Sequence, residues 1–509
     1  MSKQALPLST PVAVIGAGAM GAGIAQVAAQ AGHPVRLLDN RPGAAEQAVA
    51  GIRAQLAKLA DKGRLSPEAA QAAGDRLSAA ASSAELADAG LVIEAIVENL
   101  EVKRALFREL EAICGADCIF ATNTSSISVT AIAAGLQAPG RLLGMHFFNP
   151  APLMALVEIV SGLASERQLA DTLFDTAAAW GKTPVHAKST PGFIVNRVAR
   201  PYYAEGLRLL QEGAADCATL DAVMREAGGF RMGPFELMDM IGHDVNFAVT
   251  KSVWNAFYQD PRFQPSLIQQ ELVDAGFIGR KSGRGFYDYR AGAERAQPQS
   301  AAPVGAPADI LVCGDSPAAL ALAARLQAAG VAFSRAASID GRIAETASVV
   351  LFQTDGRSAT QRACNSGIAN LALVDLALDY GQASRLALAL ARQAHPAAQQ
   401  AAVGLLQAAG YAGALLADVP GLAVMRTVSM LANEAADAVN QGVCDAAAAD
   451  AAMRLGVNYP RGPLAWADAV GVERIRTVLA HLNQFYGEDR YRVSPLIQQA
   501  VHAGSPIHA

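Results

Sequence analysis

The chain has 509 residues, of which 52% are hydrophobic and 17% are charged, and its formal net charge is −5 at pH 7. This length predicts several modules of roughly 100–200 residues each, because single cores rarely grow larger. The composition excludes a disordered chain, and the weak negative charge disfavours a general nucleic-acid-binding protein.

Six cysteines are scattered along the chain without the spacing of a zinc site or the density of a secreted scaffold. We therefore expect no metal site, and reduced thiols in a cytoplasmic protein. Residues 1–11 show no signal-peptide pattern. The longest apolar run, 401–417, contains Gln407 and glycines and stops at Asp418, which favours a buried helix and strand over a membrane span.

A glycine-rich turn follows the first apolar run. Residues 12–15 predict a buried strand, and Gly16, Gly18 and Gly21 come next at GxGxxG spacing, before an Ala-rich helix. In a dinucleotide-binding unit these glycines permit the tight turn, the approach of the pyrophosphate and the packing of helix on strand. The pattern predicts a Rossmann-type domain.

An acidic residue ends the next predicted strand, 34–38. Asp39 lies 39 − 21 = 18 residues beyond the last glycine, where a carboxylate accepts hydrogen bonds from the ribose hydroxyls of NAD. The nearby Arg41 leaves NADP as a minority alternative. NAD is the predicted cofactor.

Residues 43–80 predict two amphipathic helices separated near 63–67. The first contains Lys58, whose simplest role is on a solvated helix face. The alternative is contact with a phosphate-bearing substrate tail.

Two further apolar runs, 91–96 and 119–122, predict buried strands that end in polar loops. Glu98 and Lys103 follow the first run, and Asn-Thr-Ser-Ser at 123–126, which includes Ser125, follows the second. Loops after parallel strands open onto the ligand crevice, so these side chains are candidate neighbours of cofactor or substrate. Helix capping is the simpler role of the short polar residues.

The stretch 145–150, Met-His-Phe-Phe-Asn-Pro, supplies a candidate general base. An imidazole titrates near neutral pH, so His146 held by a carboxylate could take a proton from an alcohol as hydride leaves the same carbon. Glu158, in the apolar stretch 156–160, is the candidate partner. A histidine beside two phenylalanines is otherwise more often an ordinary core residue.

These motifs, in order and at matching spacing, resemble the 3-hydroxyacyl-CoA dehydrogenases over about 280 residues. The series is GAGAMGAGIA, VIEAIVEN with Lys103, TNTSS, HFFNP with Glu158, and PGFIVNR around Asn196. The resemblance implies NAD-linked oxidation of a 3-hydroxyacyl-CoA, with His146 as base, Glu158 as its partner, and Ser125 and Asn196 bonded to substrate. It places Lys58 near the CoA nucleotide. The NAD site it implies contains Gly16, Gly18, Gly21, Asp39, Glu98, Lys103, Ser125, Asn149 and Lys281.

From Lys188 onward the pattern is helical, and a long helix containing Asn196 is predicted to begin at Pro191-Gly192. Arg200 lies four residues beyond Asn196, hence on the same face of that helix, and could bind a terminal carboxylate of the acyl chain. An ordinary surface or interhelix salt bridge is the alternative.

The helical region repeats after the linker. Each matching pair is 229 positions apart, which indicates a duplicated module. The pairs are Pro191-Gly192 with Pro420-Gly421, Glu205 with Glu434, Asp221 with Asp450, Gly233-Pro234 with Gly462-Pro463, and 267–270 with 496–499. The second nucleotide-like unit is shorter. It has lost the glycine fingerprint and the ribose acid, and the second helical module has Met425 in the place of Asn196.

The predicted fold is an α/β Rossmann-type domain followed by an all-α domain, with a degenerate, shortened second copy of both. The predicted parts are an NAD-binding domain with a helical-hairpin insertion at 1–187, a helical domain at 188–290, a linker at 291–308, a degenerate Rossmann-like unit at 309–415, and a second helical domain at 416–509. The second half is expected to act as a packing partner, either in a homo-oligomer or as an internal pseudo-dimer.

The tandem arrangement resembles the long dehydrogenases of phenylacetate catabolism, which implies 3-hydroxyadipyl-CoA as substrate. Three alternatives stay open: an enzyme for 3-hydroxybutyryl-CoA or other fatty acyl chains, a non-catalytic NAD-binding structural protein, and a dehydrogenase of small free 3-hydroxy acids. The last would carry a catalytic lysine in place of the His146 and Glu158 pair. The expected partner is an acyl-CoA small molecule, with no nucleic acid and no membrane.

Overall fold

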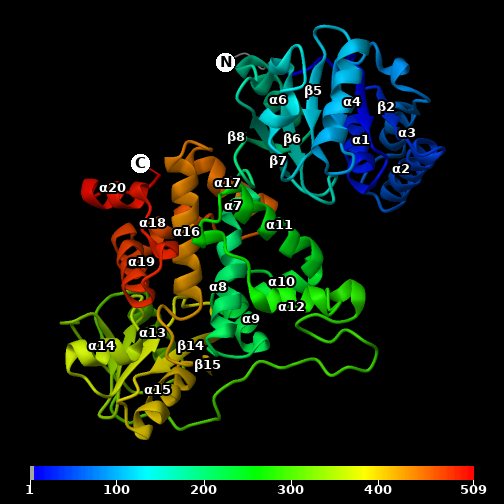
Figure 1. The fold of residues 1–509 in the computed structure, drawn as a ribbon. Helices are drawn as coiled ribbons and strands as arrows, with labels where there is room; N and C mark the ends of the chain where they lie inside the picture. Colours follow the sequence, from blue (N-terminus) through cyan, green and yellow to red (C-terminus); the bar gives the residue numbers. More distant parts are fainter. Residues whose placement is uncertain (1–4, 509) are drawn as a thin grey trace. The chain divides into compact units, whose positions relative to one another are not determined.

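The computed structural model describes residues 5–508, which form two compact units (Figure 1). The first unit runs to Arg197 and also contains residues 441–457, and the second contains the remaining residues. Among the residues described, no helix is both long and apolar enough to cross a membrane. The five-part division drawn from the sequence stays a prediction.

An eight-stranded sheet forms the centre of the first unit, in the order β3-β2-β1-β4-β5-β6-β7-β8. Its neighbouring strands are parallel except for the antiparallel pair β6 and β7. This order places the glycine turn, at the end of the central strand β1, in a Rossmann-type sheet as predicted. The strands are β1 (Val12–Ile15), β2 (Val35–Leu38), β3 (Leu77–Ala79), β4 (Leu91–Glu94), β5 (Ile119–Thr122), β6 (Leu142–Phe147), β7 (Leu156–Ser161) and β8 (Thr183–Lys188).

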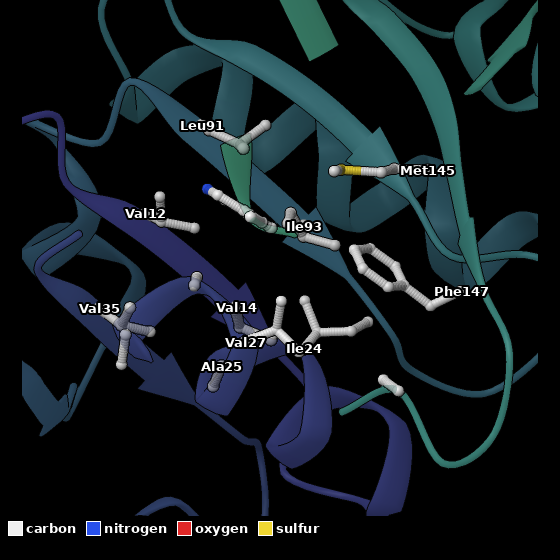
Figure 2. Close-up of a cluster of buried hydrophobic side chains, with 14 of the residues drawn as sticks. Val12, Val14, Ile24, Ala25, Val27, Val35, Leu91, Ile93, Met145 and Phe147 are labelled. Atoms are coloured by element: carbon white, nitrogen blue, oxygen red, sulfur yellow. The ribbon is translucent and has the colours of Figure 1, made fainter. Parts of the chain in front are cut away.

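The strands are nearly continuous apolar runs because both faces of the sheet are covered. Figure 2 shows Val14 and Ile93 of neighbouring strands pointing into one cluster with Ile24 of the following helix. The predicted helical pair in the insertion is confirmed as α2 and α3. The helices between these strands are α1 (Ala19–Ala31), α2 (Ala44–Asp61), α3 (Pro67–Asp75), α4 (Leu100–Ile113), α5 (Val129–Ala133) and α6 (Arg167–Ala179).

Side chains alternate between the two faces of the sheet along β6 and β7, so core residues and candidate catalytic residues lie on opposite faces. Met145 and Phe147 point into the cluster beneath α1, so His146 between them points to the opposite face. Val157 and Ile159 likewise enter that cluster, which places Glu158 on the same face as His146. The antiparallel register then sets these two residues directly opposite each other.

The predicted long helix from Pro191-Gly192 is wrong. Residues 191–194 form a turn, α7 spans Val195–Val198, and α8 begins only at Arg200 and runs to Gln211. Pro201 accounts for the break, because proline has no N–H and its ring clashes with the carbonyl four residues earlier. The second copy has Met430 at the matching place, and α16 (Val424–Asn440) is continuous. Asn196 and Arg200 therefore lie on different helices.

The second unit contains a reduced sheet and both helical modules, except for residues 441–457 and the start of the first module. In the first module α8 is followed by α9 (Cys217–Glu226), α10 (Pro234–Ile241), α11 (His243–Ala256) and α12 (Leu267–Asp274). In the second, α16 packs against α8 and is followed by α18 (Pro463–Val470), α19 (Val472–Tyr486) and α20 (Pro495–Ala503), coloured orange to red in Figure 1.

The reduced sheet has seven strands in the order β10-β9-β11-β12-β13-β14-β15. It retains the antiparallel step, now between β13 and β14, which confirms a degenerate second copy. Its strands are β9 (Leu311–Cys313), β10 (Ser334–Ala336), β11 (Arg342–Glu345), β12 (Val350–Gln353), β13 (Leu371–Val374), β14 (Arg385–Leu390) and β15 (Ala412–Leu415), with helices α13 (Pro317–Ala328), α14 (Ala359–Ser366) and α15 (Pro396–Ala408).

The two copies exchange helices. In the first unit α17 (Ala446–Gly456), from the second helical module, packs on β7 and β8, whereas in the second unit α9 packs on β14. The backbone repeats this relation: Lys188 N donates to Val443 O (2.9 Å), and Ala417 N donates to Ala214 O (2.9 Å). Both pairs obey the offset, since 417 − 188 = 229 and 443 − 214 = 229. Each sheet is thus completed by the helical module of the other copy.

A buried ion pair joins α8 and α16 inside the second unit. The Arg426 guanidinium is fully buried and donates through Nε to Glu205 (2.7 Å) and through both terminal nitrogens to Glu212 (3.0 and 2.9 Å). It also donates to the hydroxyls of Tyr486 (2.9 Å) and Tyr491 (2.8 Å). Every guanidinium donor therefore has a partner, which a buried arginine requires.

We expect Arg426→Ala to lower the free energy of unfolding by about 3–5 kcal/mol, because the buried Glu205 would lose its bond to Arg426 and keep only Arg208 as a cationic partner. Chemical denaturation measures this difference. The control is Arg476→Ala, which breaks an exposed pair with Glu473 and should cost about 1 kcal/mol or less. A loss of about 1 kcal/mol or less in Arg426→Ala, equal to that of the control, would show that the buried pair is dispensable.

Candidate active site

The three fingerprint glycines meet the demands of a pyrophosphate turn. Gly16 has φ +104°, and a Cβ there would lie 2.4 Å from Ala95 O. At Gly21 a Cβ would lie 1.8 Å from Gly16 O, which shows how tightly α1 packs on the turn. Around Gly18, in contrast, no described heavy atom lies within 4 Å of a Cβ position. The open space and the helix N-terminus behind it suit a pyrophosphate.

Asp39 closes the other side of this turn. Its carboxylate accepts from Ala17 N (2.7 Å) and Arg41 N (2.9 Å), and the Arg41 guanidinium lies 3.0 Å away. The Arg41 side chain is the main cause that lowers the pKa of Asp39 to about 2. The group is therefore ionised at any working pH, as an acceptor for ribose hydroxyls must be. The glycines and Asp39 together fit NAD.

The Glu98 carboxylate organises the loop that contains Ser125. Glu98 accepts hydrogen bonds from the Thr124 hydroxyl (2.5 Å), Ser125 N (3.0 Å) and Ser126 N (3.0 Å). Burial would raise the pKa of Glu98, but the Thr124 hydroxyl and the Lys103 ammonium outweigh it, so the pKa is lowered. Glu98 is thus an anion that holds the backbone of this loop.

Lys103 lies behind Glu98 and is 1% exposed. Its ammonium donates to Glu94 (2.6 Å) and lies 3.3 Å from Glu98. Sequence reasoning did not single out Glu94, although an acidic residue that ends an apolar strand signals a buried polar partner. Direct contact of Lys103 with NAD stays a prediction, while its contact with the two carboxylates is observed.

His146 and Glu158 form the expected dyad. His146 Nδ1 lies 2.6 Å from Glu158 Oε2, and His146 Nε2 lies 3.2 Å from Ser125 Oγ. A carboxylate at Nδ1 favours the tautomer with its proton there, which leaves Nε2 as a hydrogen-bond acceptor. The ring also packs against Phe148 (4.6 Å between centroids) and Phe193 (5.7 Å). The proton-accepting nitrogen therefore faces the loop of Ser125.

The second oxygen of Glu158 fixes the start of α7. Glu158 Oε1 accepts from Ile194 N (3.0 Å) and Val195 N (3.0 Å), the residues just before Asn196. One fully buried carboxylate thus ties the base on β6 to the helix that contains Asn196. In the first unit, contacts thus link Ser125, His146 and Glu158, and Asn196 lies on the short helix that Glu158 anchors.

Four other predicted residues have no described contact with the dyad. Lys58 is exposed on α2, and Asn149 is exposed after β6. Lys281 belongs to the second unit, where its ammonium pairs with Asp244 (2.6 Å). Arg200, also in that unit, is buried, donates to Thr250 Oγ1 (3.0 Å) and lies over the Tyr203 ring. Ligand contacts of these residues stay predictions.

The second copy has modified the phosphate turn. Ser316, at the place of the second glycine, accepts from Ala319 N (3.3 Å) and so caps α13 with its own side chain. The corresponding start of α1 receives no side-chain cap from the residues described. A helix start left open for a ligand in one copy is therefore closed in the other.

The second copy has also replaced the dyad. Val185 pairs with Glu158 in the first sheet, and Ala414, 414 − 185 = 229 positions later, pairs with Ala387. Asp375 lies opposite Ala387 and donates its N–H to Ala387 O (3.0 Å). Asp375 thus occupies the place of His146, and Ala387 that of Glu158.

Asp375 performs the structural part of Glu158's role. Its Oδ2 accepts from Ala423 N (2.9 Å) and Val424 N (2.8 Å), which lie 229 positions after Ile194 and Val195. Burial is the main cause that raises the pKa of Asp375 to about 6. The anchor for the following helix is kept, whereas the imidazole is gone. The offset of 229 also relates these pairs, since 375 − 146 = 229 and 387 − 158 = 229, so the sequence itself carried the signal. The strand register shows that the two positions are equivalent in space.

Comparison with known proteins agrees with this site. Residues 11–190 match the NAD-binding domain of 3-hydroxyacyl-CoA dehydrogenase, and residues 192–289 and 421–507 each match its C-terminal domain. Residues 351–420 match the reduced Rossmann-fold domain of 3-hydroxybutyryl-CoA dehydrogenase.

Similar proteins share either the whole chain or its first half. The 3-hydroxyadipyl-CoA dehydrogenase of Escherichia coli K12 is 45% identical over 96% of both chains. A probable 3-hydroxybutyryl-CoA dehydrogenase of Bacillus subtilis is 41% identical and covers 55% of this chain and 96% of its own. A crystal structure titled 3-hydroxybutyryl-CoA dehydrogenase, from E. coli K12, superposes with a TM-score of 0.89 at 43% identity, covering 98% of this chain and 99% of that one. The matches span both halves and the site, and the chain belongs to the 3-hydroxyacyl-CoA dehydrogenase family.

Proposed function

We propose that the protein oxidises a 3-hydroxyacyl-CoA to the 3-oxoacyl-CoA with NAD, using His146 as the base. The observation that supports this most directly is the buried contact of 2.6 Å between His146 Nδ1 and Glu158, with Nε2 directed to Ser125. Family membership supplies the substrate class, and the glycine turn with Asp39 supplies the cofactor site.

Proton transfer follows from this geometry. NAD, held by the glycine turn and Asp39, would supply the acceptor for the hydride that leaves C3 of the substrate. The hydroxyl on that carbon becomes acidic as hydride leaves, and His146 Nε2 takes its proton. Glu158 stabilises the resulting imidazolium without itself becoming protonated, because its other oxygen remains bonded to Ile194 N and Val195 N. Ser125 and Asn196 would hold the substrate oxygen against the ring.

The proposed substrate is 3-hydroxyadipyl-CoA. Support comes from the full-length relative of that name, which shares the tandem arrangement. The structural relative titled 3-hydroxybutyryl-CoA dehydrogenase keeps the shorter monocarboxylic substrate as the second candidate. The carboxylate clamp by Arg200 has lost its first premise, since Asn196 and Arg200 do not share a helix. It stays a prediction to be tested with the substrates.

Only the first copy is proposed to be catalytic. The capped start of α13 and the replacement of His146 by Asp375 remove phosphate binding and proton transfer separately. The second half would then be an internal pseudo-dimer partner, in line with the exchanged α9 and α17. The cytoplasmic location expected from the cysteines stays a prediction.

A panel of CoA thioesters tests the function. We expect NADH formation from 3-hydroxyacyl-CoA, with a higher kcat/KM for 3-hydroxyadipyl-CoA than for 3-hydroxybutyryl-CoA. Free 3-hydroxy acids should be poor substrates. In Arg200→Leu, a clamp predicts loss on the dicarboxylic substrate alone, whereas equal losses on both would reject it. Tight NAD binding without NADH from any thioester would favour a non-catalytic protein.

We expect His146→Gln and Glu158→Gln to keep wild-type NAD affinity, since neither touches the glycine turn. The His146 variant should lose about 10²–10⁴ in kcat, because no other base replaces it. Stopped-flow NADH formation and calorimetric titration with NAD separate the two properties. Wild-type turnover in His146→Gln would refute the base assignment.

Calorimetry should give one NAD equivalent per chain. Gly18→Val, which fills the open space in the first turn, should abolish this binding, whereas Ser316→Ala in the second turn should leave it unchanged. Two equivalents per chain, or binding that survives Gly18→Val, would mean that the second copy retains a site.

A further inference from the structure

The segment 441–457 belongs to the catalytic unit although it comes from the second helical module. Within it, α17 packs on β7 and β8. Leu156 precedes Glu158 by two residues on β7, so both side chains point to the same face of the sheet. The last residue of α17, Gly456, approaches Leu156 on this face.

The approach at Gly456 is close enough to affect Glu158. A Cβ on Gly456 would lie 2.7 Å from Leu156 Cδ2 and 3.0 Å from Val195 Cγ2. Val195 is the residue whose N–H donates to Glu158 Oε1 (3.0 Å). Its branched side chain is stiff at χ1 and cannot easily move away. A larger residue at 456 would therefore push on the backbone that anchors Glu158.

Two polar contacts hold the same region. Arg197 lies two residues beyond Val195 and is 2% exposed. Its guanidinium donates to Gln441 Oε1 (2.9 Å). At the end of β8, Lys188 N donates to Val443 O (2.9 Å). The α7 turn and the edge of the sheet are thus fastened to one segment.

Cys444 shows that this segment reaches the surroundings of the dyad. Burial, and then the charge of Glu158, raise the pKa of the Cys444 thiol to about 12. A residue of the second module therefore lies close enough to feel the charge of Glu158.

The position equivalent to Gly456 in the first helical module holds a different residue. Gly456 corresponds to Ala227, since 456 − 229 = 227, and Ala227 follows α9 at the sheet that lacks a dyad. Glycine is the poorer helix residue by about 1 kcal/mol in a helix interior, so propensity does not favour it at 456. Leu156, which crowds Gly456, is likewise matched by Arg385 in the second sheet.

We propose that Gly456 and Gln441 are positioning residues for the active site. The duplicated module would keep the α7 turn in place, the turn would keep Glu158 in place, and Glu158 would orient His146. The second half then does more than replace a dimer partner, because it aligns a base that it has lost itself. This inference rests on the proposed dehydrogenase function.

Gly456→Val tests the close approach. We expect kcat to fall by about 10- to 100-fold, with KM for both substrates and NAD affinity nearly unchanged, because the glycine turn lies on other elements. The pH at which kcat is half-maximal should move down, since a displaced carboxylate stabilises a protonated ring less well.

The matched control is Ala227→Val, which adds the same bulk at the equivalent position away from the dyad. It should lower thermal stability while kcat and the pH profile stay at wild type. Ala447→Val, at an exposed position of α17, controls for helix propensity. A wild-type enzyme without activity on any 3-hydroxyacyl-CoA would refute the proposed function instead.

Gln441 provides a second test that does not depend on folding around a bulky residue. Gln441→Ala should lower kcat, and Gln441→Glu should restore it, because the first copy has Glu212 at this place and pairs it with Arg426. If Gly456→Val does not fold, this pair decides alone. Equal kcat in Gly456→Val and Ala227→Val, or no effect of Gln441→Ala, would overturn the proposal.

Discussion

The bonds of the Glu158 carboxylate are the constraint on which the site depends. One oxygen holds His146 Nδ1, and the other accepts two backbone N–H groups at the start of α7. A fully buried carboxylate is costly unless each oxygen has donors, so the strand pair and the helix start must come together for the fold to be stable. The same bonds that satisfy the charge orient the base.

The second copy separates these two requirements. Asp375 occupies the position equivalent to the histidine, yet it accepts from Ala423 N and Val424 N, the pair of backbone N–H groups equivalent to the pair that Glu158 binds. The helix start still needs an acceptor in the core, whereas proton transfer is no longer needed. Structural and chemical roles that one residue pair combines in the first copy are therefore distinguishable by comparing the two.

The exchange of α9 and α17 shows what the duplicated module does: each sheet packs against a helix from the other copy. Neither sheet is completed by the helical module that follows it in sequence. A single chain that carries both modules supplies the exchanged helix without having to associate, so the concentration of the partner no longer matters. The buried Arg426 pair with Glu205 and Glu212 adds an electrostatic join between α8 and α16.

The sequence by itself determined the Rossmann turn, the NAD acid and the identity of the dyad. Short-range rules suffice there: glycine spacing after an apolar strand, an acid at the next strand end, and a histidine and a glutamate in consecutive strands. It also determined the duplicated module, because an ungapped offset of 229 is visible without coordinates.

Only the tertiary structure decided how Glu158 is anchored, that Asp375 binds the corresponding helix start in the second copy, and that α17 packs on the strand of Glu158. Strand register and helix exchange depend on packing between segments hundreds of residues apart, which no local pattern encodes. The break before Arg200 belongs partly to each class. Pro201 indicated the break in the sequence, but the helical pattern on both sides of it favoured one long helix. The start of α7 lies where the N–H groups of Ile194 and Val195 bind Glu158.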